Sequence, residues 1–377
     1  MLREVLIKDD ENILVHGRTV PGRDPAVLLW GGSGIELNVN GTELWVDIQA
    51  CYSNREPWIA IEIDGALIAR QIVDTERRWI PIYRQKEAGR PTRVRIIKEQ
   101  QAMGEDTDHR LEVWGFKTDG EILPAKQYTK KIEFIGDSIN SGEGSMGAKD
   151  ACEWNPLYFS HTHAYPYMVA GDLDAEYRVI SQGGWGLYAP WNNMRANNIP
   201  RIYPEVCGVC DKDFALGGVH EANDFAAWQP DFICVNLGTN DDGAFHNPPG
   251  EDEEGRPFKM HMTGESFENG EYKQGTDYDP ADMKKVQDAA RDFLKLLREK
   301  NPNAYIFWCY GIMGDGMEPP IRAGLEEYKK NSGDSRVEYL PMPPMTEETT
   351  GSLMHPGPRA HRLAADVIVR RIKEIAG

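Results

Sequence analysis

The chain has 377 residues, which is long for one typical domain and sufficient for two. Its 42 basic and 60 acidic residues give a net charge of −18, so its surface repels nucleic acids and anionic membranes. A hydrophobic content of 40% provides for substantial cores and excludes a disordered chain.

The N-terminus predicts a cytoplasmic protein. Arg3, Glu4 and Lys8 fall where a secretory signal peptide needs an unbroken apolar core. No apolar run approaches the ~20 residues of a membrane span, and six cysteines in a chain of this length do not make a disulfide framework. We therefore expect no membrane partner and no nucleic-acid partner, and the sequence does not predict an oligomeric state.

Residues 1–125 are predicted to form an all-β domain. Asn40-Gly41 and Asp64-Gly65 each separate two strand-like runs, and these dipeptides favour two-residue hairpin turns. Alternation of apolar and polar residues with period two, without a convincing helix, indicates a sandwich of the jelly-roll kind. The runs cover residues 26–30, 34–50, 58–73, 92–99 and 109–116.

Residues 126–377 are predicted to form an α/β domain. Apolar, strand-like runs begin at Ile132, Tyr177, Asp231, Ala304 and Arg336. Helix-like segments alternate with them and cover about 163–173, 280–300, 321–330 and 358–377. This alternation predicts a parallel sheet with helices on both faces, and functional residues in such folds lie beyond the carboxyl ends of the strands.

A serine stands where the first of these strands stops. The stretch KIEFIGDSIN, residues 131–140, passes from an apolar run into small polar residues, and Ser138 is the candidate nucleophile. A nucleophilic serine needs a base and donors for the oxyanion. His355 in MHPGPRAH is the candidate base, because imidazole exchanges protons near neutral pH. Taken singly, Ser138 could be a helix cap and His355 a surface residue before a helix.

Candidate oxyanion donors follow two other strands. Gly184 in SQGGWGL offers an unobstructed backbone N–H, and Asn240 in NLGTNDD offers a side-chain amide. Each alone could be an ordinary turn residue. Their order along the chain, with Ser138 first and His355 last, favours one shared crevice.

These four segments resemble the sequence blocks of the SGNH (GDSL-type) hydrolases, whose fold is flavodoxin-like. The β-domain placed before IEFIGDSI further resembles carbohydrate esterase family 2, acetyl esterases with an N-terminal jelly roll. The resemblance covers nearly the whole chain. It implies that Ser138 is the nucleophile and His355 its base, and that the Ser138 N–H, Gly184 and Asn240 form the oxyanion hole.

The resemblance also implies a function. The protein would be a serine esterase that removes O-acetyl groups from plant-derived oligosaccharides of the xylan or mannan type. Its partner would be the acetylated oligosaccharide, and no cofactor and no metal would be required.

One position departs from the SGNH pattern. These hydrolases usually carry Asp three residues before the histidine, to orient its ring, and here that residue is Ser352. The resemblance to family 2 implies a Ser–His dyad whose histidine is steadied by a backbone carbonyl; Glu347 or Glu348 would be the alternative. The missing Asp also leaves a second function open, a carbohydrate-binding protein with a catalytically degenerate hydrolase domain.

The polar, Gly/Pro-rich segment 241–279 is predicted to be a flap near the site, because it begins beside Asn240. An ordinary surface loop is the alternative. We expect Trp185 and Phe245 to bind substrate, and three further aromatic residues of the segment could stack on sugar rings: Phe258, Phe267 and Tyr272.

Two further motifs suggest other chemistry. GEGSMG, residues 142–147, matches the dinucleotide fingerprint, but it begins six residues after its strand ends and Glu143 would face a pyrophosphate. Cys207 and Cys210, with His220 nearby, lack the second ligand pair of a structural zinc site. Both motifs are interpreted as ordinary loop or core segments.

Overall fold

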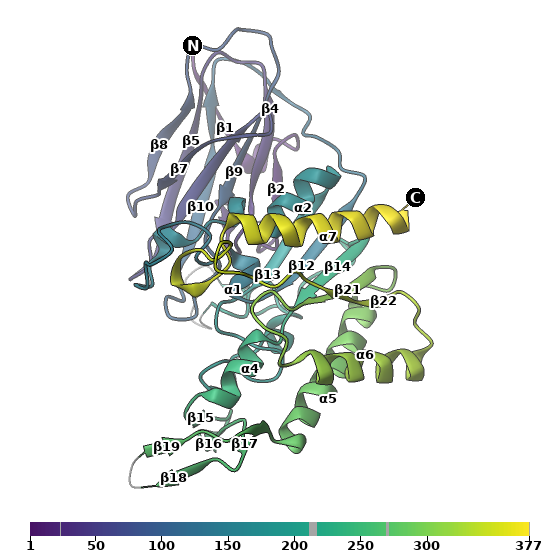
Figure 1. Cartoon of the computed structure of the whole chain (residues 1–377). Coiled ribbons are helices and arrows are strands. Elements are labelled where there is room, and N and C mark those ends of the chain that lie inside the picture. Colours follow the sequence, from purple (N-terminus) through teal and green to yellow (C-terminus); the bar gives the residue numbers. More distant parts are fainter. Residues whose placement is uncertain (23, 211–216, 269–270, 377) are drawn as a thin grey trace.

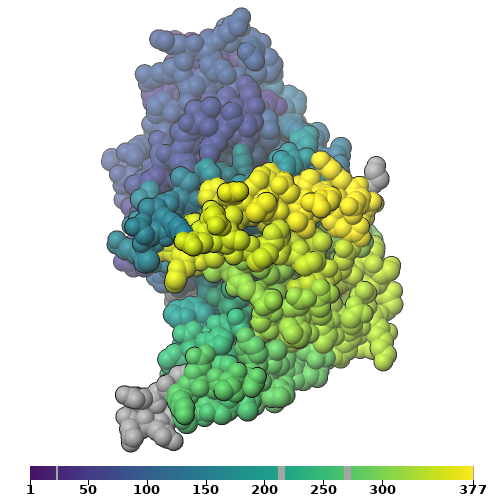
Figure 2. Space-filling view, in the orientation of Figure 1, coloured from purple at the N-terminus to yellow at the C-terminus, as the bar shows by residue number. Residues whose placement is uncertain are grey.

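The computed structural model describes residues 1–22, 24–210, 217–268 and 271–376. An all-β unit lies at one end of the molecule, and an α/β unit follows it (Figure 1). The C-terminal helix α7 (Pro358–Ala376) crosses the middle of the molecule in Figures 1 and 2. Among the described residues, no helix is both long and apolar enough to cross a bilayer.

The all-β unit consists of two antiparallel sheets around a common core. Leu37 and Ile96 of one sheet and Val46 and Val113 of the other are fully buried in this core. The first sheet has the order β1 (Arg3–Leu6), β10 (Arg110–Thr118), β5 (Leu44–Cys51), β8 (Arg78–Tyr83), with β3 (Ala26–Leu28) beside β10. The second has the order β11 (Ile122–Leu123), β4 (Gly34–Val39), β9 (Thr92–Lys98), β6 (Trp58–Ile63), β7 (Ala66–Ile72), with β2 (Leu14–His16) beside β4. The jelly-roll assignment and the domain boundary at 125/126 stay predictions.

One of the two predicted hairpins is confirmed. Asp64 and Gly65 join β6 to β7, with Ile63 paired to Ala66, and both turn residues have positive φ, 52° and 85°. This is the backbone that a two-residue turn of the mirror-image type requires.

The other hairpin prediction is wrong. Strands β4 and β5, which flank Asn40-Gly41, belong to different sheets. The Asn40 side chain accepts a hydrogen bond from the Glu121 N–H, and a Cβ at Gly41 would lie 2.3 Å from Thr118 Oγ1. Packing against residues 118–121 therefore carries the chain from one sheet to the other at this point.

The predicted parallel sheet is confirmed. Its order is β13 (Glu176–Ser181), β12 (Lys131–Gly136), β14 (Phe232–Asn236), β21 (Tyr305–Tyr310), β22 (Val337–Pro341), all parallel. This is the flavodoxin-like order. Helices α2 (Tyr165–Leu173) and α7 pack on one face of the sheet, and α5 (Pro280–Lys300) and α6 (Glu318–Ser332) pack on the other.

Shorter elements complete the α/β unit. The helical ones are α1 (Ser138–Ser141), α3 (Ile199–Ile202), α4 (Thr239–His246) and the 3-10 turns η2 (Pro156–Tyr158), η3 (His161–His163) and η4 (Ser352–Met354); η1 (Ile7–Asp9) belongs to the all-β unit. After α4, the described part of segment 241–279 contains three small ribbons, β15 (Gly250–Glu251) with β16 (Pro257–Phe258), β17 (Met262–Thr263) with β20 (Asp277–Tyr278), and β18 (Ser266–Glu268) with β19 (Glu271–Lys273). They lie at the end of the molecule remote from the all-β unit (Figure 1).

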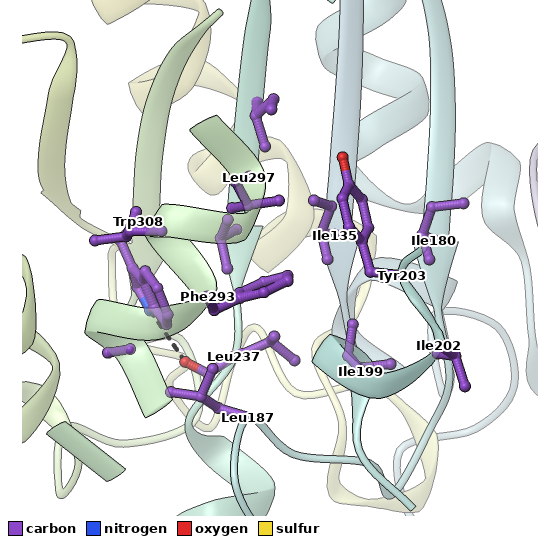
Figure 3. Close-up of a cluster of buried hydrophobic side chains, with 14 of the residues drawn as sticks. Ile135, Ile180, Leu187, Ile199, Ile202, Tyr203, Leu237, Phe293, Leu297 and Trp308 are labelled. Atoms are coloured by element: carbon purple, nitrogen blue, oxygen red, sulfur yellow. Dashed lines mark hydrogen bonds between the residues drawn. The ribbon is translucent and has the colours of Figure 1, made fainter. Parts of the chain in front are cut away.

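The core under α5 continues into the all-β unit. In Figure 3, Ile135 and Ile180 of the sheet lie in the same cluster as Phe293 and Leu297 of α5. Trp30 of the all-β unit is fully buried in this cluster too, and its Nε1–H donates to the Val206 carbonyl at 2.9 Å. The two units therefore share one hydrophobic core.

A buried ion pair joins the units next to this core. Arg18 Nη2 donates to Glu133 Oε1 of β12 at 3.1 Å, and Nη1 donates to the Tyr203 carbonyl at 2.5 Å. The Tyr203 hydroxyl donates to the other Glu133 oxygen at 2.7 Å. Both charged side chains are buried, so removing either one leaves its partner without full compensation.

We predict that Arg18→Met destabilises the protein by about 3–5 kcal/mol, the usual cost of an uncompensated buried charge. Adding Glu133→Gln should restore much of that loss, because the orphaned carboxylate is then neutral. Urea unfolding of the two variants and the wild type measures both effects. A double variant as unstable as the single one would contradict the explanation.

Candidate active site

Ser138 lies at the carboxyl end of β12, at the first position of α1. Asp137 caps this short helix, since its Oδ1 accepts the Ile139 N–H at 3.0 Å. Gly136 is the last residue of the strand, and glycine is needed there because a Cβ would lie 2.4 Å from the Asn140 side chain. At the first helical position the Ser138 N–H has no partner within the helix, so it remains free to bind a ligand oxygen.

His355 meets Ser138 although 217 positions separate them in the chain. Its Nε2 lies 2.9 Å from Ser138 Oγ, and its Nδ1 lies 2.8 Å from the Leu353 carbonyl oxygen. A carbonyl can only accept, so Nδ1 carries the proton and Nε2 accepts the serine hydroxyl. This is the orientation in which an imidazole removes the proton of a nucleophile.

A distorted backbone presents that carbonyl to the ring. Leu353 and Met354 both have φ of 57°, the left-handed region that residues other than glycine rarely adopt. Such a residue costs roughly 1–3 kcal/mol, so surrounding contacts must hold it. The Leu353 N–H donates to the Ala151 carbonyl at 2.7 Å, and the Ser352 N–H donates to that of Gly144 at 3.0 Å.

The residues near the missing Asp do not contact the imidazole. The Ser352 hydroxyl donates to the Met146 carbonyl at 2.5 Å. Glu347 pairs with Lys149 at 3.1 Å on the surface, and Glu348 accepts the Thr346 hydroxyl. The alternative that one of these two glutamates orients the histidine is therefore wrong, and the expected backbone carbonyl is in contact instead.

The predicted oxyanion donors lie around the same point. Gly184 has φ of +79°, a backbone that favours glycine, and a Cβ there would lie 3.0 Å from the Trp191 ring. Asn240, at the start of α4, donates from Nδ2 to Asp137 Oδ2 and to the Trp185 carbonyl, each at 3.1 Å. These contacts tie the Gly184 turn and α4 to the residue before Ser138.

The two contacts engage both hydrogens of the Asn240 amide. An oxyanion would therefore compete with Asp137 or with the Trp185 carbonyl for one of them. Asn240 can therefore act as the predicted oxyanion donor only if its amide gives up one of these two hydrogen bonds.

Three buried carboxyl groups that have no role predicted from the sequence surround the site. Burial raises the pKa of Asp137 to about 7 and that of Asp241 to about 6, and it also raises the pKa of Glu143. Asp241 accepts the N–H groups of the turn that follows Gly184, namely those of Leu187, Tyr188 and Ala189. The only available signal was position, because Asp241 directly follows Asn240.

A cavity of about 530 Å³ begins at the Gly184 turn. Two tryptophans, Trp185 and Trp191, stand in its wall, and Trp191 is 49% exposed. The wall is completed by Gly104 and Glu105 of the all-β unit and by residues between 182 and 220. Trp185 therefore lines a cavity next to the Gly184 turn, and its substrate-binding role stays a prediction.

The substrate-binding assignment of Phe245 is wrong. Its ring is fully buried and packs edge-on against Tyr278, with centroids 5.0 Å apart. Phe258 is half-buried against Tyr188. The side chains of Phe267 and Tyr272 lie outside the described part of the structure. Among the described residues lining the cavity, none belongs to 241–279, so the described part of this segment does not form a wall of it.

The remaining motifs have structural explanations. Gly144 of GEGSMG has positive φ, and a Cβ there would lie 2.7 Å from His355 Cβ, so the glycine permits close approach to the histidine. Cys207 and Cys210 lie with their sulfurs 3.5 Å apart, and His220 contacts the Cys210 carbonyl through Nε2. Within the described ranges, no cluster of three or more His, Cys, Asp and Glu could hold a metal ion.

The fold and the four converging segments define a hydrolase of the SGNH type. The chain superposes on an acetyl xylan esterase, Est2A, from the rumen bacterium Butyrivibrio proteoclasticus, with a TM-score of 0.94, 40% identity, and coverage of 100% of this chain and 99% of that one. A family two carbohydrate esterase from Clostridium thermocellum, solved in complex with cellohexaose, shares the fold with a TM-score of 0.76 and 24% identity over 97% of this chain and 99% of that one. The chain belongs to the family two carbohydrate esterases.

Curated relatives carry related names. The cellulase/esterase CelE of Acetivibrio thermocellus is 27% identical over 98% of this chain, and an acetylxylan esterase/glucomannan deacetylase of Cellvibrio japonicus is 30% identical over 62% of it. The chain spans 40% and 62% of the length of these two relatives. No family model matches the chain.

We predict that Ser352→Ala changes kcat on p-nitrophenyl acetate only slightly, because its hydroxyl binds a distant carbonyl and not the imidazole. The free energy of unfolding should fall by about 1 kcal/mol, the scale of one lost hydrogen bond. A fall in kcat near ~10⁴, the scale of a disabled orienting carboxylate, would show that Ser352 does orient His355.

We also predict that Asp137 makes stability depend on pH. Between the ordinary carboxyl range near pH 4 and its folded pKa of about 7, the folded state keeps a proton that the unfolded state has lost. The free energy of unfolding therefore falls as pH rises through this window. Asp137 costs no stability below the window, and above it the full cost of its buried charge is present. Asp137→Asn removes the titration, so its Tm should improve relative to wild type as pH rises through the window.

In this variant an amide NH₂ group replaces the carboxyl oxygen that accepts from Asn240 Nδ2, so two donors face each other. The resulting loss of stability does not change with pH. The readout is therefore the pH dependence of the Tm difference, measured by thermal melts on either side of the window. The exposed variant Asp150→Asn serves as the control for losing one charge. Parallel Tm curves for Asp137→Asn and wild type would contradict the prediction.

Proposed function

We propose that the chain is a carbohydrate O-acetyl esterase that acts through Ser138 and His355. The observation that carries the proposal is the 2.9 Å contact between Ser138 Oγ and His355 Nε2, with the Nδ1 proton directed to the Leu353 carbonyl. This arrangement favours an active enzyme over a carbohydrate-binding protein with a degenerate hydrolase domain, because a degenerate site has no need to retain it.

In the proposed first half-reaction, Ser138 Oγ attacks the acetyl carbonyl carbon while its proton passes to His355 Nε2. The tetrahedral intermediate places its oxyanion near the N–H groups of Ser138 and Gly184 and the amide of Asn240. The intermediate collapses as His355 returns the proton to the sugar oxygen, which leaves as a free hydroxyl. Ser138 then carries the acetyl group.

In the second half-reaction, His355 accepts a proton from water, and the resulting nucleophile attacks the acetyl-serine. Collapse of this intermediate releases acetate and returns the proton to Ser138. In both halves the imidazolium faces the Leu353 carbonyl dipole, which supplies less stabilisation than the full charge of a carboxylate would. The partly buried setting strengthens that dipole relative to its effect in water.

Acetylated oligosaccharides of the xylan or mannan type are the proposed substrates. The names of the relatives support this class, because they describe acetylxylan and glucomannan esterases. The cavity also supports it, because it adjoins the oxyanion turn and carries Trp185 and Trp191, side chains with flat apolar faces that suit sugar rings. Both units contribute to its wall.

Turnover of p-nitrophenyl acetate and acetate release from acetylated xylo- and manno-oligosaccharides test the proposal. Ser138→Ala and His355→Ala should each lower kcat by several orders of magnitude without unfolding the chain, because the pair acts as a unit. Ser145→Ala is the matched control, since this buried hydroxyl donates to main-chain carbonyls of Gly142 and Ser160. Near-wild-type turnover in a folded Ser138→Ala variant would refute the assignment.

A further inference from the structure

A run of four buried polar residues lies at the end of β9 in the all-β unit. Lys98, Glu99, Gln100 and Gln101 are all at most 2% exposed. Buried polar side chains need partners, so each must be engaged within the protein. Lys98 Nζ donates to the carbonyls of Gln100 at 2.6 Å and Gln101 at 2.8 Å, which fixes the backbone of the run.

Gln101 reaches from this run into the active site. Its Oε1 accepts the Gly183 N–H at 2.7 Å and the Ser141 hydroxyl at 2.6 Å. Gly183 precedes the oxyanion donor Gly184, and Ser141 closes the helix that starts at Ser138. One amide oxygen therefore joins the two segments whose N–H groups face the oxyanion in the proposed reaction.

The space beside Gly183 is also filled. A Cβ at Gly183 would lie 2.8 Å from Glu143 Oε2 and 3.1 Å from Gln101 Nε2. Ser141 Oγ also lies 2.8 Å from Oγ of Ser181, the last residue of β13. Gly183, Ser141 and Ser181 thus form one hydrogen-bonded cluster around a side chain supplied by the all-β unit.

We propose that Gln101 is a positioning residue for the oxyanion hole, through which the all-β unit takes part in catalysis. The inference rests on the proposed function. Gln101 does not touch the reacting atoms; it holds the Gly183–Gly184 turn and α1 at the separation that the oxyanion requires. Displacement of a catalytic group by about 1 Å can cost on the order of 10²-fold in rate.

The test compares Gln101→Met with Gln100→Met in the full chain. Methionine keeps the length of the side chain and loses the accepting oxygen. Gln100 is the matched control, because it is equally buried in the same run, yet its oxygen accepts the Trp58 N–H at 2.6 Å and its nitrogen donates to the Pro156 carbonyl at 3.1 Å. Both variants should lose similar stability.

Only Gln101→Met should lower kcat on p-nitrophenyl acetate, by roughly 10- to 100-fold, with KM nearly unchanged, because the oxyanion exists only after the bond forms. Amide hydrogen exchange of residues 181–187 should also speed up in Gln101→Met alone. Equal losses of kcat in both variants, or unchanged exchange in Gln101→Met, would overturn the inference.

Two further arms keep the test decisive. If Gln101→Met does not fold, Gln101→Glu retains an accepting oxygen and should keep slow exchange and most of the turnover; a folded Gln101→Glu with fast exchange overturns the inference. If the wild type shows no turnover that depends on Ser138, the proposed function fails, and the exchange measurement alone then decides whether Gln101 holds the turn.

Discussion

The hydrogen bond from His355 Nδ1 to the Leu353 carbonyl is the interaction on which the site depends. It fixes the proton on Nδ1 and leaves Nε2 to accept the Ser138 hydroxyl. The carbonyl reaches the ring because two successive residues hold a left-handed backbone, and neighbouring main-chain bonds to Gly144 and Ala151 keep them there. A backbone carbonyl, held in place by a strained turn, thus occupies the position of the carboxylate that SGNH hydrolases usually provide.

That replacement changes the electrostatics of the site. A backbone carbonyl carries no net charge, so it does not add a titrating group beside the imidazole. Burial raises the pKa values of Asp137 and Glu143, which favours the uncharged form of both carboxyl groups near the site. Asp137 also accepts from Asn240, so its protonation state acts on the candidate oxyanion donor as well as on the nearby His355.

The parts of this structure that follow from local pattern could be predicted. Apolar strands alternating with amphipathic helices predicted the parallel sheet, and polar residues after three of its strands predicted where Ser138, Gly184 and Asn240 lie. Asp64-Gly65 formed its hairpin because both residues tolerate positive φ. Asn40-Gly41 has the same local chemistry, but packing against residues 118–121 overrode it.

Long-range placement could not be predicted in this way. The aromatic character of Phe245 fits a sugar platform as well as a core, and only the folded chain shows that its ring is buried. The backbone at Leu353 and Met354 has no signature in the sequence, since neither residue favours that conformation. The contacts of Gln101 could not be predicted either, because its partners lie 40 and 82 positions further along the chain.

The core shared by the two units limits how this chain can be recombined. Trp30 fills space under the α/β sheet, and Arg18 neutralises a carboxylate of its first strand. A crossover that joined this catalytic sheet to a foreign N-terminal segment would have to replace an indole and a guanidinium at the same positions. Exchange of the all-β unit is therefore confined to donors that already carry matching contacts.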